Sequence, residues 1–335
     1  MYIVDIDAPA DNAVSGRRIP RSVGSKYAKT FIGETIDYSG NYRIVRFYMS
    51  TIASNDWSFE DVTLATQTSI NNLHYIIQLA KRWEGLISCA IFAPNIESSF
   101  VTDVIEKLRF CYPILYSVTF HLVYPSVDLA DMSLVGNWLD LGCDEIISEI
   151  KHFGADNYQG STPYPHNVLR NVARSGANTE FIYLIDIDTI PSTGLREQFV
   201  NFASEKKLWG KTDDQVVYVT PAFEMQDGYK VPETKNELLS GISENYIRPF
   251  HNESCHFCHF SQNTSKWSKV QFETDQQRIS VAFVAEWMEA WEPFYIAHRS
   301  VPLHDERFRD FGFDRRQQIC ELYLGDYQFA VLGTG

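Results

Sequence analysis

The residues most able to do chemistry are two aspartates, Asp186 and Asp188, which directly follow the apolar run 181–185. A continuous apolar run is typical of a strand that is buried on both faces of a sheet. Side chains two residues apart on a strand point to the same side, and two unpaired carboxylates would be costly to bury there. The pattern predicts a divalent cation, Mn²⁺ or Mg²⁺, bound by both carboxylates at the carboxyl edge of a sheet and bridging them to a diphosphate.

A second pair with the same spacing, Asp5 and Asp7, lies at the start of the chain. Two aspartates around one residue are a weak signal by themselves. Since few residues precede this pair and no strand–helix pattern surrounds it, we expect it to lie in a solvated turn. The context, rather than the motif, therefore selects Asp186 and Asp188.

A helix expected at 165–174, just before the two aspartates, carries Asn167, Arg170, Asn171 and Arg174 on one face. Arginine can clamp a phosphate or a sugar carboxylate with two parallel hydrogen bonds, and asparagine can bond to sugar hydroxyls. We therefore regard these four residues as candidate donor-binding residues. The alternative is an ordinary solvated helix face.

Carboxylates accompany aromatic residues at two places in the last third of the chain. Trp291 and Glu292 begin one of them, and Asp305 and Glu306 begin the other. Aromatic faces can stack on sugar rings, and a nearby carboxylate can take the proton of an attacking hydroxyl. The alternative is an aromatic core with surface charges.

Cys255 and Cys258 fit a haem-attachment pattern with His259, and a zinc cluster if His251 is added. A disulfide is the preferred interpretation, because no second pair of zinc ligands is evident. Asn252 and Asn263 lie in sequons for N-glycosylation. With six cysteines in the chain, these sequons are compatible with the secretory pathway.

The composition excludes some classes of function. Of the 335 residues, 44% are hydrophobic, enough for a large core, and the net charge of −14 argues against a general nucleic-acid binder. No apolar stretch reaches the roughly 20 residues needed to span a bilayer. We therefore expect no membrane span and no signal peptide in the chain.

The elements that must position these residues alternate between strand and helix from about residue 58. Strands are expected at 42–48, 62–66, 87–92, 115–124, 181–185 and 216–220, and helices at 70–83, 101–110, 144–152, 165–174, 193–204, 234–243 and 315–324. This alternation predicts an α/β fold with a mainly parallel sheet. We expect 1–57 to be a loosely structured lead-in, 58–190 a nucleotide-sugar half, and 191–332 an acceptor half that is irregular after about residue 244.

Six collinear segments between about residues 58 and 332 resemble glycosyltransferase family 49, whose members extend the O-mannosyl glycan of α-dystroglycan. They are 62–68, 82–85, 167–174, 186–192, 291–295 and 305–313. The resemblance implies a GT-A fold with a Rossmann-like sheet, a UDP-sugar donor, Mn²⁺ and inversion to a β-linkage. It places Asp186 and Asp188 at the metal, Thr66 and Gln67 near the nucleotide, and the helix bearing Arg170 and Arg174 beside the donor.

From this resemblance we expect an inverting transferase with UDP-glucuronic acid as donor, and UDP-N-acetylglucosamine or UDP-xylose as alternatives. The expected acceptor is a β-linked sugar on an O-mannosyl-type glycan in the Golgi lumen. Asp305 is the expected general base, with Glu292 and Glu306 in reserve. The family's membrane anchor and its C-terminal metal-binding histidine are missing from this sequence, so we also expect impaired catalysis. The rival hypotheses are a non-catalytic glycan- or partner-binding relative and a Cys/His metal-binding module.

Overall fold

The computed structural model describes residues 2–5, 33–50, 57–127, 138–152, 163–212, 214–253, 255, 258, 260–270, 278–309 and 312–333. The strands are β1 (Tyr2–Asp5), β2 (Glu34–Ile36), β3 (Tyr42–Met49), β4 (Val62–Ser69), β5 (Ile87–Phe92), β6 (Val118–Pro125), β7 (Phe181–Leu184), β8 (Thr189–Pro191), β9 (Val216–Thr220), β10 (Ala222–Met225), β11 (Ile247–Pro249), β12 (Ser280–Ala285), β13 (Phe294–His298) and β14 (Gln328–Gly333). The α-helices are α1 (Tyr75–Trp83), α2 (Val101–Cys111), α3 (Cys143–His152), α4 (His166–Ser175), α5 (Leu195–Glu205), α6 (Lys235–Ser243), α7 (Thr264–Lys269) and α8 (Arg316–Leu324).

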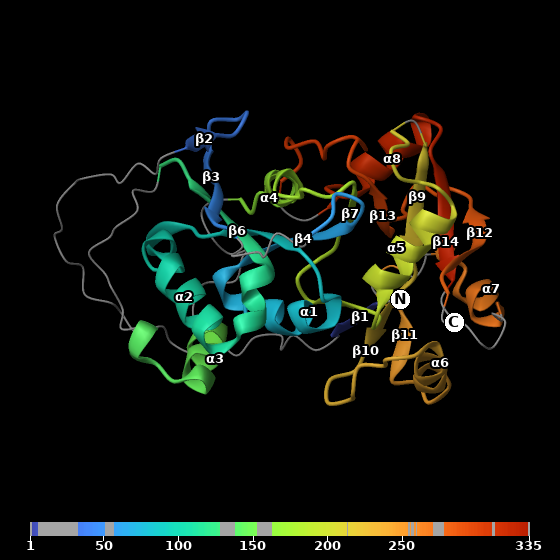
Figure 1. The fold of residues 1–335 in the computed structure, drawn as a ribbon, viewed down its shortest axis with the longest axis horizontal. Helices are drawn as coiled ribbons and strands as arrows, with labels where there is room; N and C mark the ends of the chain where they lie inside the picture. The colour runs from blue at the N-terminus through green and yellow to red at the C-terminus, as the bar shows by residue number, and fades with distance from the viewer. Residues whose placement is uncertain are drawn as a thin grey trace.

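A ten-stranded sheet in the described residues runs the length of the molecule, from β2 and β3 at one end to β12 and β14 at the other (Figure 1). Its order is β12-β14-β9-β13-β7-β4-β5-β6-β3-β2. The neighbours β7, β4, β5 and β6 all run parallel to one another. Antiparallel partners flank this run, β13 on one side and β3 on the other. The α/β prediction is confirmed, and the parallel part of the sheet lies where the strand–helix alternation predicts it.

Helices cover both faces of the parallel run. Leu64 and Cys89 pack in the same apolar cluster as residues of α1, α2 and α3, whereas Ala65 and Ala90 pack with α4. This division follows from the alternation of side chains along a strand. In Figure 1, α4 lies on one side of the sheet and α1, α2 and α3 lie on the other. Each large aliphatic side chain that is fully buried here contributes about 1.5–3 kcal/mol, so the parallel run is a frame stabilised mainly by apolar packing.

Helix α4 packs unusually closely on the sheet. Its partners Ala65 and Ala90 are small, and the residue that follows the helix is Gly176. A Cβ atom at Gly176 would lie 2.3 Å from Nε2 of His121 and 2.4 Å from Oγ of Ser88. Only glycine allows this approach, which holds the carboxyl end of α4 against β5 and β6.

The part of the chain after residue 244 is more regular than the sequence predicts. Strand β13 lies between β9 and β7, and β14 lies between β12 and β9. The prediction of an irregular half is therefore wrong for these residues. These strands pair with segments far away in the sequence, and no local pattern reveals such pairing.

In the first part of the chain, β3 confirms the strand expected at 42–48, whereas β1 and β2 were not expected. Strands β2 and β3 extend the large sheet through the pairing of β3 with β6. Strand β1 lies between β10 and β8 in a separate four-stranded sheet of order β11-β10-β1-β8. Asp5 is the last residue of β1, so the expected solvated turn is wrong there, and Asp7 lies outside the described residues.

Two disulfides are present, Cys111–Cys143 and Cys255–Cys258. The first joins the end of α2 to the start of α3 on the frame, and the second follows β11. Among the described residues, no helix combines the length and the apolar character that crossing a membrane requires.

Candidate donor and metal site

The two aspartates lie at the carboxyl edge of the parallel strands, as predicted. In the register of β4 with β7, Ala65 lies opposite Leu184, and the amide of Ile185 donates to the carbonyl of Ala65 at 3.1 Å. If this register is continued, Thr66 and Gln67 come alongside Ile185 and Asp186. Thr66 and Gln67 are both buried, and the Tyr164 hydroxyl donates to Oε1 of Gln67. The predicted nucleotide and metal residues are thus neighbours at one sheet edge.

Asp186 is held between two arginines. Nη2 of Arg315 lies 2.7 Å from both carboxylate oxygens, and Nη2 of Arg170 lies 3.8 Å from Oδ1. Burial by itself raises the pKa of Asp186, but the charges of Arg315 and Arg170 outweigh it and hold the pKa below its usual range. Arg315 also lies over the Phe294 ring, with Cζ 4.1 Å from the centroid. The carboxylate is therefore ionised at neutral pH, and a protein cation accompanies it.

The donor set at the two aspartates suits a hard cation that keeps several non-protein ligands. The Asp186 side chain remains 32% exposed, and Asp188 is half-buried two residues further along. No cluster of three or more His, Cys, Asp or Glu side chains with metal-binding geometry occurs in the described part of the chain. Two carboxylates with phosphate and water oxygens are a usual arrangement for Mg²⁺ and Mn²⁺. The residues present fit such an ion, with Arg315 contacting the same carboxylate.

Three consecutive residues before and at the start of α8 each contact a different part of the site. Asp314 accepts from Nη1 of Arg170 at 2.5 Å, Arg315 binds Asp186, and Nε of Arg316 donates to Glu292 at 2.7 Å. These three residues were not among the predicted site residues. The available signal was a run of three charged side chains at the start of the expected helix at 315–324, in a chain where only 21% of residues are charged.

The polar face of α4 is buried, so the alternative of a solvated helix face is wrong. Arg174 donates to the carbonyls of Val301 and Pro302 at 2.7 and 2.6 Å. Asn171 exchanges two hydrogen bonds with the main chain of His304, one of 2.8 Å and one of 3.0 Å. Both side chains thus fasten a loop that follows β13.

The other two polar residues of α4 lie nearer to the aspartates. Asn167 donates to the carbonyls of Asp305 and Asp314, at 2.9 and 2.8 Å, and its Oδ1 accepts from Arg170 at 3.0 Å. Of these four residues, Arg170 is the one whose side chain reaches Asp186 in the described part of the chain. Helix α4 lies between the sheet and this loop, so it is buried on both its apolar and its polar side.

The predicted acceptor-side residues have different environments. Trp291 is fully buried against Phe329, with ring centroids 5.2 Å apart. Its side chain belongs to the core and cannot stack on a sugar, so the acceptor-side prediction is wrong for Trp291. Glu292 forms an ion pair with Arg316. Glu306 accepts from Nδ2 of Asn171 at 3.0 Å.

The predicted base, Asp305, forms an ion pair with Arg307, whose Nε is 2.9 Å from both carboxylate oxygens. These hydrogen bonds hold the pKa of Asp305 below its usual range, so the carboxylate is ionised at neutral pH. Arg307 itself is 81% exposed. An exposed partner of this kind can leave the carboxylate at little free-energy cost.

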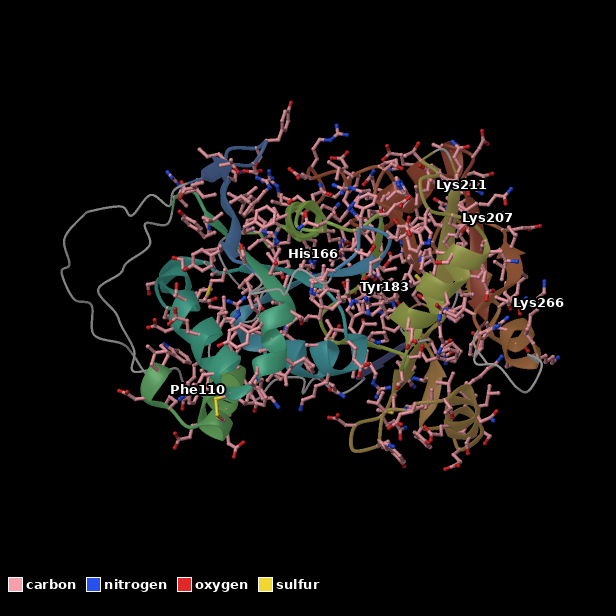
Figure 2. All side chains as sticks on the ribbon, viewed as in Figure 1. Phe110, His166, Tyr183, Lys207, Lys211 and Lys266 are labelled. Atoms are coloured by element: carbon pink, nitrogen blue, oxygen red, sulfur yellow. A yellow bond between two sulfur atoms is a disulfide. The ribbon has the colours of Figure 1, made fainter. Side chains whose placement is uncertain are left out.

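Two histidines lie in the electrostatic environment of Asp186. His166 begins α4 and is labelled in Figure 2; burial, followed by the charge of Arg170, lowers the pKa of His166 to about 4. Burial also lowers the pKa of His251, although the negative charges of Glu292, Glu224 and Asp186 oppose it. The two imidazoles are therefore neutral at pH 7. The sequence analysis considered His251 only as a zinc ligand and did not select His166.

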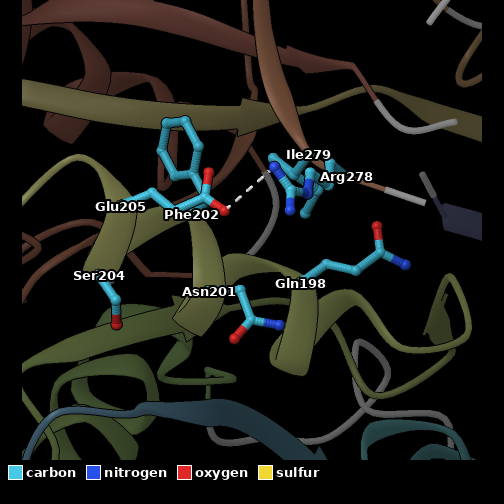
Figure 3. Close-up of a pocket in the computed structure, with 7 residues that line it drawn as sticks. All are labelled: Gln198, Asn201, Phe202, Ser204, Glu205, Arg278 and Ile279. Carbon is cyan, nitrogen blue, oxygen red and sulfur yellow. Dashed lines mark ion pairs between the residues drawn. The ribbon is translucent and has the colours of Figure 1, made fainter. Parts of the chain in front are cut away.

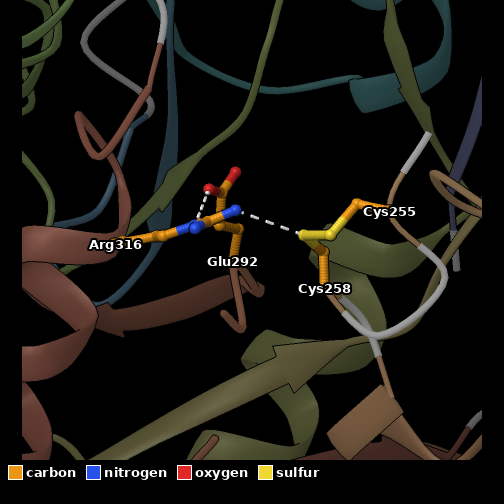
Figure 4. The surroundings of a disulfide bond; sticks show 4 residues. All are labelled: Cys255, Cys258, Glu292 and Arg316. Atoms are coloured by element: carbon orange, nitrogen blue, oxygen red, sulfur yellow. Dashed lines mark hydrogen bonds and ion pairs between the residues drawn. A yellow bond between two sulfur atoms is a disulfide. The ribbon is translucent and has the colours of Figure 1, made fainter. Parts of the chain in front are cut away.

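The preferred disulfide interpretation of Cys255 and Cys258 is confirmed. Figure 4 shows that Arg316 reaches both Glu292 and the disulfide, with Nη2 3.3 Å from Sγ of Cys258. Because both sulfurs are in the disulfide, they are not thiolates that could bind zinc or attach a haem. The disulfide instead lies beside Arg316.

The two sequon asparagines are exposed. Asn263 also caps α7, since its Oδ1 accepts from the amide of Lys266 at 3.0 Å. Exposure is compatible with glycosylation at Asn252 and Asn263, which stays a prediction.

A separate cavity of about 340 Å³ lies between α5 and the start of β12 (Figure 3). Its lining includes Gln198, Asn201 and the ion pair of Glu205 with Arg278. None of the predicted site residues lines it. The candidate site is thus distinct from this cavity.

Comparison with known proteins identifies the family. Residues 61–335 match a family model described as a glycosyl-transferase for dystroglycan. The chain is 36% identical to β-1,4-glucuronyltransferase 1 of Danio rerio, an alignment that covers 96% of this chain and 77% of that protein. It is 34% identical to β-1,4-glucuronyltransferase 1 of Homo sapiens, covering 90% and 72%. It is 26% identical to the xylosyl- and glucuronyltransferase LARGE2 of Rattus norvegicus, covering 81% and 33%. The chain therefore belongs to glycosyltransferase family 49, and it is a glycosyltransferase.

Proposed function

We propose that this enzyme transfers glucuronic acid from UDP-glucuronic acid to a β-linked sugar, with inversion at the anomeric carbon. The names of the relatives support glucuronyl transfer. The observation that carries the proposal is the pair Asp186 and Asp188 at the carboxyl edge of β4 and β7, with Arg170 and Arg315 against Asp186. Two arginines suit a donor that has both a diphosphate and a sugar carboxylate.

In this proposal, Asp186 and Asp188 hold Mn²⁺ or Mg²⁺, which would neutralise the charge that develops on the departing nucleotide. Thr66 and Gln67 line the nucleotide side, where the buried β4 edge excludes water. Arg170 is kept in place by Asp314 and Asn167, so its guanidinium is oriented toward the donor before any substrate binds. Asn167, Asn171 and Arg174 act indirectly by fixing the loop that carries Asp305 and Glu306.

Asp305 is the proposed general base. It would accept the proton of the acceptor hydroxyl as the new glycosidic bond forms and the bond to UDP breaks. Its carboxylate is paired with the exposed Arg307, which solvent can replace. Glu292 and Glu306, by contrast, are engaged by Arg316 and by the buried Asn171.

We extend the proposal to an acceptor on an O-mannosyl-type glycan and to the Golgi lumen. The family description supports this acceptor class. The two disulfides support an oxidising compartment.

The deciding experiment offers the purified chain a panel of donors with Mn²⁺ and follows UDP release with and without a β-xyloside or β-glucoside acceptor. The panel is UDP-glucuronic acid, UDP-xylose and UDP-N-acetylglucosamine. We expect acceptor-dependent turnover to be highest with UDP-glucuronic acid and to disappear when EDTA is added. A preference for either other donor would reassign the sugar, and turnover that EDTA does not affect would remove the metal from the proposal.

A further inference from the structure

Phe313 has an unfavourable backbone conformation at the edge of the site. Its φ is +60°, in the left-handed region, and it follows Gly312 with φ +107°. A bulky side chain in this region is strained, and such strain persists only where the surrounding structure imposes it. Strained residues of this kind cluster at binding and catalytic sites.

The ring of Phe313 does little for the stability of the core, because the residue is 61% exposed. Fully burying such a ring would be the usual way for it to contribute to stability. What fixes its position is the next two residues, since Asp314 is bound by Arg170 and Arg315 is bound to Asp186. The exposed ring is thus held next to the donor and metal residues by two ion pairs.

The position of the ring relates it to the acceptor side. Arg316, with its guanidinium 5.3 Å from the Phe313 centroid, extends to Glu292 and to the Cys255–Cys258 disulfide (Figure 4). These groups belong to the acceptor half, whereas the nucleotide side lies at the end of β4. The exposed ring and Glu292 therefore lie against the same guanidinium.

We propose that Phe313 is a stacking platform for a pyranose ring of the acceptor. The negative face of a phenyl ring attracts the weakly positive C–H groups on one face of a pyranose, and the contact also buries apolar area. This assignment deepens the proposed function and rests on it. It gives the strained conformation a purpose that packing does not supply.

The experiment measures binding of methyl β-xylopyranoside and methyl β-glucopyranoside directly, by saturation-transfer NMR, with xylitol as an open-chain control. Phe313→Ala should weaken pyranoside binding about tenfold, whereas Phe313→Trp should retain it. Phe313→Asn should also lose binding but melt at the same temperature as the wild type or higher, because asparagine tolerates a positive φ. The matched control is Phe110→Ala, another exposed phenylalanine, which lies at the opposite end of the molecule from α8 (Figures 1 and 2).

Calorimetry of UDP with Mn²⁺ on the same variants separates this inference from the proposed function. We expect UDP affinity to be unchanged by all substitutions of Phe313. Normal UDP binding with no pyranoside binding, or with pyranoside binding that is equal in all variants, overturns the platform and leaves the transferase proposal standing. If the chain binds no UDP but binds pyranosides in a way that depends on Phe313, the platform stands and the transferase proposal is overturned. An equal loss in Phe110→Ala would show that the signal comes from nonspecific contact, and would also overturn the platform.

Discussion

The parallel frame and the loop 299–309 are stabilised in different ways. The frame buries large aliphatic side chains on both faces of β4, β5 and β6. The loop is fastened by a few polar side chains, chiefly Arg174, Asn171 and Arg170 of α4, which bond to its main chain and to Asp314.

This difference has consequences for mutation. Apolar packing is spread over many contacts, so the loss of one methyl group from the frame has a graded effect. Each of these polar side chains of α4 makes several hydrogen bonds, and its removal takes donors away from buried carbonyl groups. The catalytic candidates lie where the two regions meet. Substitutions there should separate effects on chemistry from effects on loop position.

The largest loss of activity is expected from substitutions of the two aspartates that follow β7. Asp186→Asn should abolish Mn²⁺-dependent UDP binding and lower turnover by at least ~100-fold, because a neutral amide is a poor ligand for a hard cation. Calorimetry with and without Mn²⁺ measures this, and Asp188→Asn should behave alike. Asp214→Asn, an exposed aspartate, is the control. Unchanged UDP affinity in both site variants would exclude these residues as metal ligands.

In the loop, Asp305→Asn should lower the rate of transfer by about 100-fold, the lower end of the usual contribution of a general base. UDP-sugar affinity should not change, since Asp305 does not contact the donor in the proposed mechanism. Single-turnover kinetics with saturating donor provide the measurement. If Asp305→Asn retained most of the rate, Glu306→Gln and Glu292→Gln would be the next variants to examine.

Removing Arg174, which fastens the loop, should destabilise the protein. Arg174→Ala should lower the free energy of unfolding by about 2 kcal/mol, because it leaves the buried carbonyl of Val301 without its donor and removes one of the two donors to the carbonyl of Pro302, the other being Gln318. Urea denaturation checks this value. Arg278→Ala, whose side chain is 63% exposed, should change stability by less than about 0.5 kcal/mol. A similar loss in the free energy of unfolding for both variants would contradict this role of Arg174.

The ion pair of Asp314 with Arg170 should make stability depend on pH. Burial raises the pKa of Asp314, but the charge of Arg170 outweighs it and brings the pKa to about 2. Because this value lies below that of an unfolded aspartate, the stabilisation is present above about pH 4 and is lost as the pH falls through 2. Asp314→Asn should therefore cost about 2 kcal/mol at pH 7 and almost nothing near pH 2. A pH-independent difference between the two proteins would contradict this linkage.

The smallest effect concerns the contact of Arg315 with Asp186. Arg315→Gln removes a cation that competes for the carboxylate, so Mn²⁺ alone should bind about fivefold more tightly. Electron paramagnetic resonance of free Mn²⁺ measures this without any nucleotide. Weaker Mn²⁺ binding in the variant would mean that Arg315 supports the metal site rather than competing with it.

The sequence predicts the frame well for a physical reason. Strand Ile87–Phe92 and helix Cys143–His152 have local apolar patterns that suffice to define them, and the observed bounds agree with the predicted ones within a residue. The apolar run before Asp186 likewise identifies a buried strand and the edge where it ends. The positions of Asp186 and Asp188 could therefore be predicted from local sequence.

The other half of the site could not be predicted in the same way. Arg315 and Asp186 are 129 positions apart, and nothing in either local sequence indicates their contact. The buried polar face of α4 has the same spacing as a solvated face, so only its partners distinguish the two. Trp291 is of a residue type that can stack on a sugar, but its side chain is buried in the core. Long-range packing decides these assignments.

The Cys111–Cys143 disulfide makes part of the frame a covalent loop, because the two cysteines are separated by 32 positions. If a protease cuts the main chain anywhere between them, the disulfide still joins the two fragments covalently. Such a nicked enzyme would run at full length on a non-reducing gel and separate into two bands only after reduction. An intact band without reductant is consequently no proof of an intact polypeptide, and purity should be judged on reduced samples.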